Sequence, residues 1–162
     1  MYALPGSFAG PREELIATWL RLSRGRLPWD RSDPDVVVSH ASAASLHGFG
    51  TFVPTPPNFT TMRRRFDPRD ESVRLYSAKL LPDEWHWMVL SDGVALPVTT
   101  PARTVVDLAS AGEEREHVLD ALAEGRDSGL IDDDDLAAAI ERRRRRRGRG
   151  SVAWLSKAIS RG

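Results

Sequence analysis

Six consecutive arginines, Arg142 to Arg147, are the residues whose type and spacing most directly indicate chemistry, and Arg149 follows them. A run this long on a helix puts a guanidinium group on every face, so a polyanion or carboxylates elsewhere must relieve the repulsion. One use is to contact nucleic-acid phosphates in a salt-sensitive and sequence-tolerant way. A second is to dock on an acidic protein surface, and a third is a solvated helix end neutralised by Asp132 to Asp135 and the acidic segment before them. The first use predicts seven nucleic-acid contacts: Arg142, Arg143, Arg144, Arg145, Arg146, Arg147 and Arg149.

Two histidines, His40 and His47, lie seven residues apart, which is two helical turns, so they can share one face of a helix. A metal site would need a third ligand such as His86 or Asp107, and the spacing is not diagnostic of one. The favoured role is structural, in which a histidine hydrogen-bonds a helix end to the sheet. We therefore predict no metal site.

Arg103 and Asp107 are spaced i, i+4 on a predicted helix. They can form a surface ion pair worth about 0.3–0.5 kcal/mol. They can instead form a buried pair that fixes the helix to the sheet, or a contact for a partner. The two structural roles are favoured over the partner contact.

The residue types allow one catalytic arrangement, a hydrolase triad of Ser39 or Ser42 with His47. Asp107 would be its third member, but the sequence has no Gly-x-Ser-x-Gly turn. No glycine-rich phosphate loop is present either, because residues 148–150 are too short a stretch and follow no strand. The chain has no cysteine, which excludes disulfides, thiolate metal sites and a cysteine nucleophile. We predict no catalytic residue and no cofactor, and hence a protein that is not an enzyme.

Charge is strongly segregated along the chain, although the net charge is zero. Residues 82–141 hold three basic and fifteen acidic side chains, whereas residues 142–162 hold nine basic and no acidic ones. Either different surfaces meet different partners, or the tail and the body meet each other. Arg63 to Arg65 add a smaller basic patch. The sequence has neither a long apolar run nor a signal peptide, so we expect no membrane contact and a cytoplasmic location.

Hydrophobic periodicity predicts the elements that position these side chains. Ser39 is the predicted N-cap of a helix that stops at Gly48, and Thr100 is the N-cap of another that stops at Gly112. Further helices are predicted over 11–22, 118–123 (closing near Gly125 or Gly129), 136–145 and 151–159. Strands are predicted over 59–62, 73–76, 85–90 and 94–99, and residues 36–38 form a short apolar run. The predicted fold class is α+β: a small, mostly antiparallel sheet flanked by an N-terminal helical part and a C-terminal helical half. Residues 1–141 form the predicted domain, and residues 142–162 form a basic helical segment packed on it or appended to it.

Two segments carry a resemblance to a known family. The first is Ser39-His40-Ala41-Ser42-Ala43-Ala44-Ser45-Leu46-His47-Gly48. The second follows about fifty residues later and runs Leu96-Pro97-Val98-Thr99-Thr100-Pro101-Ala102-Arg103-Thr104-Val105-Val106-Asp107-Leu108-Ala109. In this order and spacing the pair resembles the AbiEi family of antitoxins and related transcriptional regulators, over roughly residues 1 to 125.

The resemblance implies an antitoxin that neutralises a nucleotidyltransferase-like toxin in a bacterial toxin–antitoxin pair. The alternative is a DNA-binding transcriptional regulator without a toxin partner. Full-length members bind their promoter through an N-terminal winged helix, and Tyr2–Gly6 resembles the segment that closes it, so this chain is expected to lack that domain. The motif residues expected to serve structure or partner contact are Ser39, His40, Ser42, His47, Gly48, Thr100, Arg103 and Asp107.

Overall fold

The computed structural model describes residues 10–24, 30, 32–63, 69–91, 93–147 and 152–160, without the side chain of Arg147. Within these ranges the chain forms six helices and five strands. The order is α1 (Pro11–Leu22), β1 (Val36–Val38), α2 (His40–His47), β2 (Asn58–Thr61), β3 (Arg74–Ser77), β4 (Trp85–Val89), β5 (Ala95–Thr99), α3 (Pro101–Ala111), α4 (Arg115–Asp127), α5 (Asp133–Arg147) and α6 (Ala153–Ile159). The predicted α+β class is confirmed.

The five strands form one mixed sheet in the order β3-β2-β1-β5-β4. Two neighbouring pairs are antiparallel, β1 with β2 and β4 with β5, whereas β1 with β5 and β2 with β3 are parallel. The expectation of a mostly antiparallel sheet was therefore wrong. A parallel pair needs a long crossover connection. Residues 62–73, which join β2 to β3, are long enough for one, so the length of this connection was the overlooked signal.

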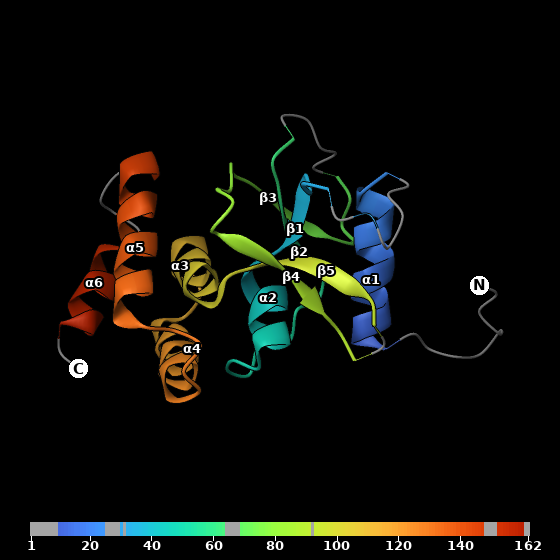
Figure 1. The fold of residues 1–162 in the computed structure, drawn as a ribbon. Helices are drawn as coiled ribbons and strands as arrows, with labels where there is room; N and C mark the ends of the chain where they lie inside the picture. The colour runs from blue at the N-terminus through green and yellow to red at the C-terminus, as the bar shows by residue number, and fades with distance from the viewer. Residues whose placement is uncertain are drawn as a thin grey trace.

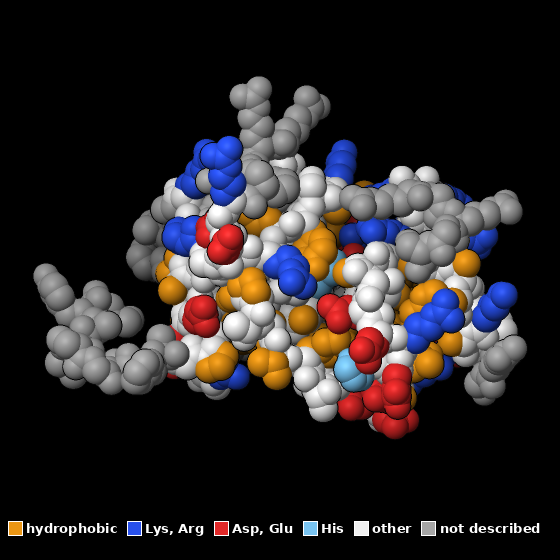
Figure 2. All heavy atoms as spheres, turned by 180° about the vertical axis from the view of Figure 1, so that it is seen from behind, with side chains coloured by type: hydrophobic (Ala, Val, Ile, Leu, Met, Phe, Trp, Pro, Cys, Tyr) orange, Lys and Arg blue, Asp and Glu red, His pale blue; other side chains and the backbone are white. Residues whose placement is uncertain are grey.

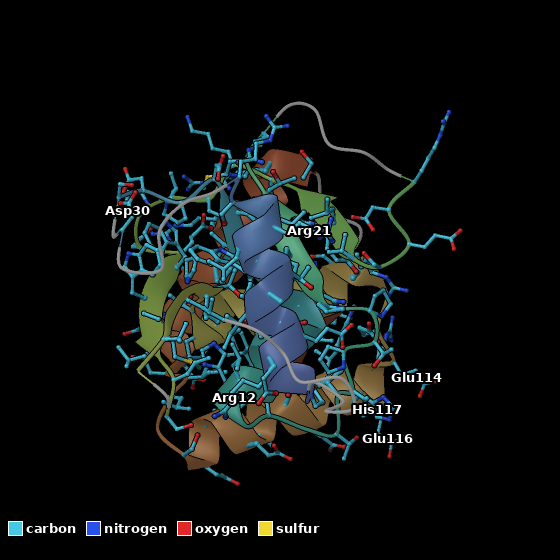
Figure 3. All side chains as sticks on the ribbon, turned by 90° about the vertical axis from the view of Figure 1, so that its right-hand side faces the viewer. Arg12, Arg21, Asp30, Glu114, Glu116 and His117 are labelled. Carbon is cyan, nitrogen blue, oxygen red and sulfur yellow. The ribbon has the colours of Figure 1, made fainter. Side chains whose placement is uncertain are left out.

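Helix α1 covers one side of the sheet, and α2 and α3 lie on the other, with α4, α5 and α6 farther out (Figure 1). Leu15 and Trp19 of α1 pack with Phe59 and alternate valines of β1 in an apolar cluster. The buried indole Nε1 of Trp19 donates a hydrogen bond of 3.0 Å to the carbonyl of Val36. Figure 3 shows Arg12 and Arg21 at opposite ends of α1, where they hydrogen-bond Ser91 and Asp70 at the surface.

A second apolar cluster joins the helices on the other side of the sheet. Helix α3 lies at its centre and packs against α2, α4 and α5. Val152 and Leu155, next to and within α6, are fully buried in this same cluster. The boundary expected between residues 141 and 142 falls inside α5, so the described part of the basic segment continues the domain and packs on it.

Local signals place most helix ends where the sequence predicts them. The hydroxyl of Thr100 caps α3 by accepting from the amide of Arg103, and α3 ends at Gly112 with a φ of 83°. Helix α2 ends at Gly48, which has a φ of 78° in the left-handed region that glycine adopts freely. None of the described helices has both the length and the apolar character needed to cross a membrane.

Candidate functional site

Arg103 lies at the centre of a buried charge network. Its Nε donates to Asp107 Oδ1 and its Nη1 to Glu84 Oε1, each at 2.8 Å. The three side chains are only 5%, 2% and 2% exposed. Of the roles considered for Arg103 and Asp107, the structure shows the buried pair. It fixes α3 to the sheet, because Arg103 also binds Glu84, which directly precedes β4.

Glu84 is the network residue that sequence reasoning missed. It follows Pro82 and Asp83 and looks like an exposed loop acid, yet it is 2% exposed. Its Oε2 accepts from the amide of Leu81, and its carbonyl accepts from the amide of Thr100, where α3 begins. The only sequence signal for the burial of Glu84 was its position directly before a tryptophan-rich strand.

The opposite charges of this network stabilise one another in the ionised form. Burial by itself lowers the pKa of Arg103, but the nearby carboxylates of Asp107 and Glu84 and their hydrogen bonds raise it above its usual value. Arg103 therefore stays a cation although it is removed from water. A buried ion is tolerated only when it is paired and hydrogen-bonded in this way.

His40 begins α2 with a φ of 51°, in the left-handed region that histidine rarely adopts. Its Nδ1 lies 2.8 Å from Ser39 Oγ, which also accepts from Thr60 Oγ1, and its ring stacks on Tyr76 with 3.5 Å between centroids. Burial lowers the pKa of His40 to about 4, with nearby arginine charges lowering it further and Asp107 opposing them. The ring is therefore neutral at neutral pH, in a strained position typical of functional sites.

Ser39 occupies the N-cap position of α2, but the prediction that its side chain caps the helix was wrong. Its hydroxyl is engaged with His40 and Thr60, as described above. Asn58 of β2 replaces it, since its Oδ1 accepts from the amide of Ala41 at 3.3 Å. Ser42 is also occupied, because its Oγ accepts from the amide of Asn58 at 2.8 Å.

The structure brings the two sequence motifs together around a cavity of about 50 Å³. Its lining includes His40 from the first motif and Arg103 and Asp107 from the second, together with Thr60, Tyr76, Ser77, Ala78 and Arg143. Asp107 Oδ2 is buried and has no hydrogen-bond partner among the described residues. The cavity is polar and has room for water but not for an organic substrate.

His47 lies away from this cavity. Its Nε2 is 2.8 Å from the carbonyl of Thr99 at the end of β5, so the predicted link between a helix end and the sheet is confirmed. Burial lowers the pKa of His47, and the nearby His86 ring lowers it slightly further, against the hydrogen bond to Thr99. The left-handed turn at His40 breaks the helical spacing, so the two histidines do not share a site. In the described ranges, no three His, Asp or Glu side chains group as a metal site would.

The hydrolase triad considered above is not assembled. His47 is bound to the carbonyl of Thr99, while Asp107 is bound to Arg103. Ser42 is hydrogen-bonded to Asn58, and the fully buried Ser39 contacts His40 instead of His47. The serines, histidine and aspartate of that arrangement each belong to a different structural contact.

The arginines of α5 meet carboxylates of the same chain. Arg142 pairs with Asp83 at 2.6 Å, and Arg144 and Arg145 pair with Glu141 at 3.5 and 3.1 Å. Arg146 lies 3.5 Å from Glu84 and donates to the carbonyl of Lys79. Arg143 lines the cavity beside His40. Arg149 and the side chain of Arg147 lie outside the part of the chain that the structure describes.

The pairs described above use Asp83, Glu84 and Glu141 of the acidic segment 82–141, and not Asp132 to Asp135, which the third alternative named beside that segment. Those acids lie at the start of α5, where Asp133 pairs with Arg126, and Arg142 follows Asp135 two turns later. The smaller basic patch is also partly structural, since Arg63 bonds Asp35 and the carbonyl of Leu22. Charge segregation along the chain was expected to mean either different partners for different surfaces or contact between the tail and the body. The ion pairs of α5 are contacts of the second kind.

A group of exposed acidic side chains lies at the start of α4. Figure 2 shows acidic side chains gathered at one corner of the face seen from behind. Figure 3 places Glu114, Glu116 and His117 together where α4 begins, and all three are exposed. The chain thus has an acidic end at α4 and a basic end at the last turns of α5.

No protein-family model matches this sequence, and no curated protein matches it. The resemblance to the AbiEi family therefore depends on the residues of the two motifs that meet at the His40 cavity.

Proposed function

We propose that this protein is an antitoxin-type binding protein of a bacterial toxin–antitoxin pair, which acts in the cytoplasm and neutralises a nucleotidyltransferase-like toxin by direct contact. One observation carries the proposal: the two segments that resemble the AbiEi family pack against each other as α2 and α3. Side chains from both segments, His40 from one and Arg103 and Asp107 from the other, line the same cavity. The resemblance thus covers one structural unit and not two unrelated stretches.

A binding role fits the state of the reactive side chains better than catalysis does. A nucleophile and its base must be within reach of each other and of a substrate. Here Ser39 is fully buried, and His47 is bound to the carbonyl of Thr99. The cavity that His40 of one motif and Arg103 and Asp107 of the other line together has a volume of about 50 Å³. We therefore propose that the protein is not an enzyme.

The alternative, a DNA-binding regulator without a toxin partner, draws less support from the arginines of α5. Arg142, Arg144, Arg145 and Arg146 each have a carboxylate of the same chain within 3.5 Å. Binding to phosphates would have to compete with these pairs. Neutralisation of a toxin does not require the arginines of α5 to give up these carboxylates.

Co-expression with the product of the neighbouring gene tests the proposal. A stable complex and restored growth support it. If the neighbouring gene encodes no nucleotidyltransferase-like protein, or if the two products neither associate nor restore growth, the proposal is wrong.

A further inference from the structure

A second pocket lies where the start of α1, helix α2 and the prolines that precede β2 meet. Its volume is about 280 Å³, and the apolar side chains that line it are Pro11, Leu15, Leu46, Pro54 and Pro57. Two serines and one arginine complete the lining. The pocket is therefore mainly apolar, with a single charged side chain.

An exposed valine extends the apolar surface beside this pocket. Val53 is 83% exposed, and it directly precedes Pro54 of the lining. A single apolar side chain on a surface is ordinary, whereas apolar side chains that adjoin one another around a pocket are typical of contact sites for other proteins. We call the pocket and Val53 together the α1–α2 surface.

The walls of the pocket are built from groups with little conformational freedom. Leu15 is 5% exposed, and Leu46 packs against the same apolar cluster to which Leu15 belongs. Proline has a fixed φ, so Pro11, Pro54 and Pro57 hold the backbone around the pocket. Such a surface loses little conformational entropy when a partner binds, which favours affinity.

Arg12 adds a positive charge to the pocket. Arg12 and Leu15 are three positions apart and lie on the same side of α1, whereas Glu13 and Glu14 of the same turn are not among the lining residues. The described hydrogen bond of Arg12 is to the hydroxyl of Ser91, which carries no charge. A carboxylate of a partner can therefore pair with this guanidinium group. The surface fits a protein segment that carries an apolar side chain next to an acidic one.

We propose that the α1–α2 surface is the contact surface for the toxin, which inserts one large apolar side chain into the pocket and pairs a neighbouring carboxylate with Arg12. The volume is slightly below the roughly 300 Å³ at which sites for whole small molecules begin, so it suits one side chain of a larger partner. Protein interfaces are commonly anchored by a few side chains buried in such pockets. The inference rests on the proposed function, because the toxin is the occupant.

Titration of the full chain with the purified product of the neighbouring gene tests the inference through the dissociation constant. Ser45 lines the pocket and is exposed, so Ser45→Trp should fill the pocket and leave the core of the domain intact. This variant should weaken the complex about a hundredfold, the effect of losing one anchor side chain. Ser45→Ala leaves the pocket open and should bind as the wild type does.

Two further pairs of variants test the charge and the exposed valine separately. Arg12→Gln should weaken the complex about tenfold through loss of a charge-assisted hydrogen bond, and Arg21→Gln, at the other end of α1, is its control (Figure 3). Val53→Ser should also weaken it about tenfold, because one apolar side chain no longer becomes buried. Leu119→Ser, at a 40% exposed position of α4, is its control. Both controls should change the affinity less than about twofold.

The outcomes separate this inference from the proposed function. If the wild-type chain binds and all three pocket variants bind equally well, the toxin contacts another surface, so this inference is wrong while the antitoxin proposal stands. Equal losses in the variants and their controls overturn the inference as well. If the wild-type chain does not bind, both proposals are wrong. If the chain alone sediments as a dimer that Ser45→Trp converts to a monomer, a second copy occupies the surface and the toxin does not.

Discussion

Arg103 of α3 and Glu84, directly before β4, form a buried ion pair with 2.8 Å between Nη1 and Oε1, although they are nineteen positions apart in the chain. Asp107 binds the other side of the same guanidinium group. This arrangement fixes the helix that carries the second motif to an edge strand of the sheet. It also holds one wall of the cavity into which His40 of the first motif projects.

Removal of Arg103 should strongly destabilise the fold. Arg103→Met leaves the carboxylates of Glu84 and Asp107 buried without their cation, which typically costs about 3–5 kcal/mol of unfolding free energy. Urea unfolding followed by circular dichroism measures the change. Arg145→Met is the control, since its pair with Glu141 is exposed and such pairs contribute at most about 0.5 kcal/mol. A loss below about 1 kcal/mol for Arg103→Met, within the range of an ordinary surface pair, contradicts the structural role of the network.

Stability should fall with acid because His40 is buried as the neutral form. Its pKa is about 4 in the folded protein against an ordinary value of 6.5, so between these values the unfolded chain binds more protons than the folded one. Burial of the neutral His40 ring therefore leaves the free energy of unfolding almost unchanged above pH 6.5 and lowers it as the pH falls from 6.5 toward 4. Linkage gives a loss of about 2 kcal/mol near pH 5.

The His40→Asn variant tests this origin, because asparagine tolerates the left-handed backbone conformation of residue 40. Its unfolding free energy should vary less between pH 7 and pH 5 than that of the wild type, by about the same 2 kcal/mol. His117→Asn, at an exposed position of α4, should keep the wild-type dependence. An unchanged slope in His40→Asn would show that other groups cause the acid sensitivity.

The last helix should contribute to the stability of the whole domain. Leu155 is fully buried in the helical cluster, so Leu155→Ala should cost about 2–5 kcal/mol through lost burial and the cavity left behind. Lys157→Ala, two residues away and exposed, is the matched control. A single cooperative transition that shifts as a whole is expected in chemical unfolding. A separate early transition for residues 142–162 would mean that this segment is appended and not integrated.

Binding to duplex DNA should be weak and only slightly dependent on salt. Each phosphate that a protein neutralises adds about 0.9 to the slope of log K against log salt, and we expect a slope below about 2 because most described arginines of α5 are already paired. Titrations at several salt concentrations measure it. A slope above about 5 that disappears after charge reversal at Arg143, Arg145 and Arg147 would instead favour the DNA-binding regulator.

Local signals were enough to predict most of the elements. Pro11 and Pro101 in first turns, Thr100 as a cap, and glycines at positions 48 and 112 mark helix ends through backbone preferences of single residues. Gly125 shows the limit of such signals, because α4 continues through it. The side chain of Ile131 lies 2.5 Å from where a Cβ of Gly125 would be, so this glycine serves close packing and not a helix end. The helix ends later, before Gly129, whose φ is 71°.

The site was less predictable, since it is built by contacts between distant segments. Arg103 and Asp107 were identified from their i, i+4 spacing, but the third member, Glu84, is joined to them only by the folding of β4 beside α3. The left-handed conformation of His40 likewise has no sequence signal. The ring is held by Ser39, which accepts in turn from Thr60, and by stacking on Tyr76. The parallel pairing of β2 with β3 differs, since the length of residues 62–73 was a signal for it that the prediction did not use.

The most direct test of the proposed function is co-expression of this chain with the product of the neighbouring gene, scored by growth and by co-purification. The account predicts that growth is restored and that the two proteins purify as a stable complex. Arg145→Glu should retain both results, because the proposal assigns no toxin contact to this exposed arginine, whose pair with Glu141 adds little to stability. Arg103→Met should lose both through loss of the fold. Unrestored growth together with no complex, from a wild-type chain that is folded and expressed, would contradict the antitoxin proposal.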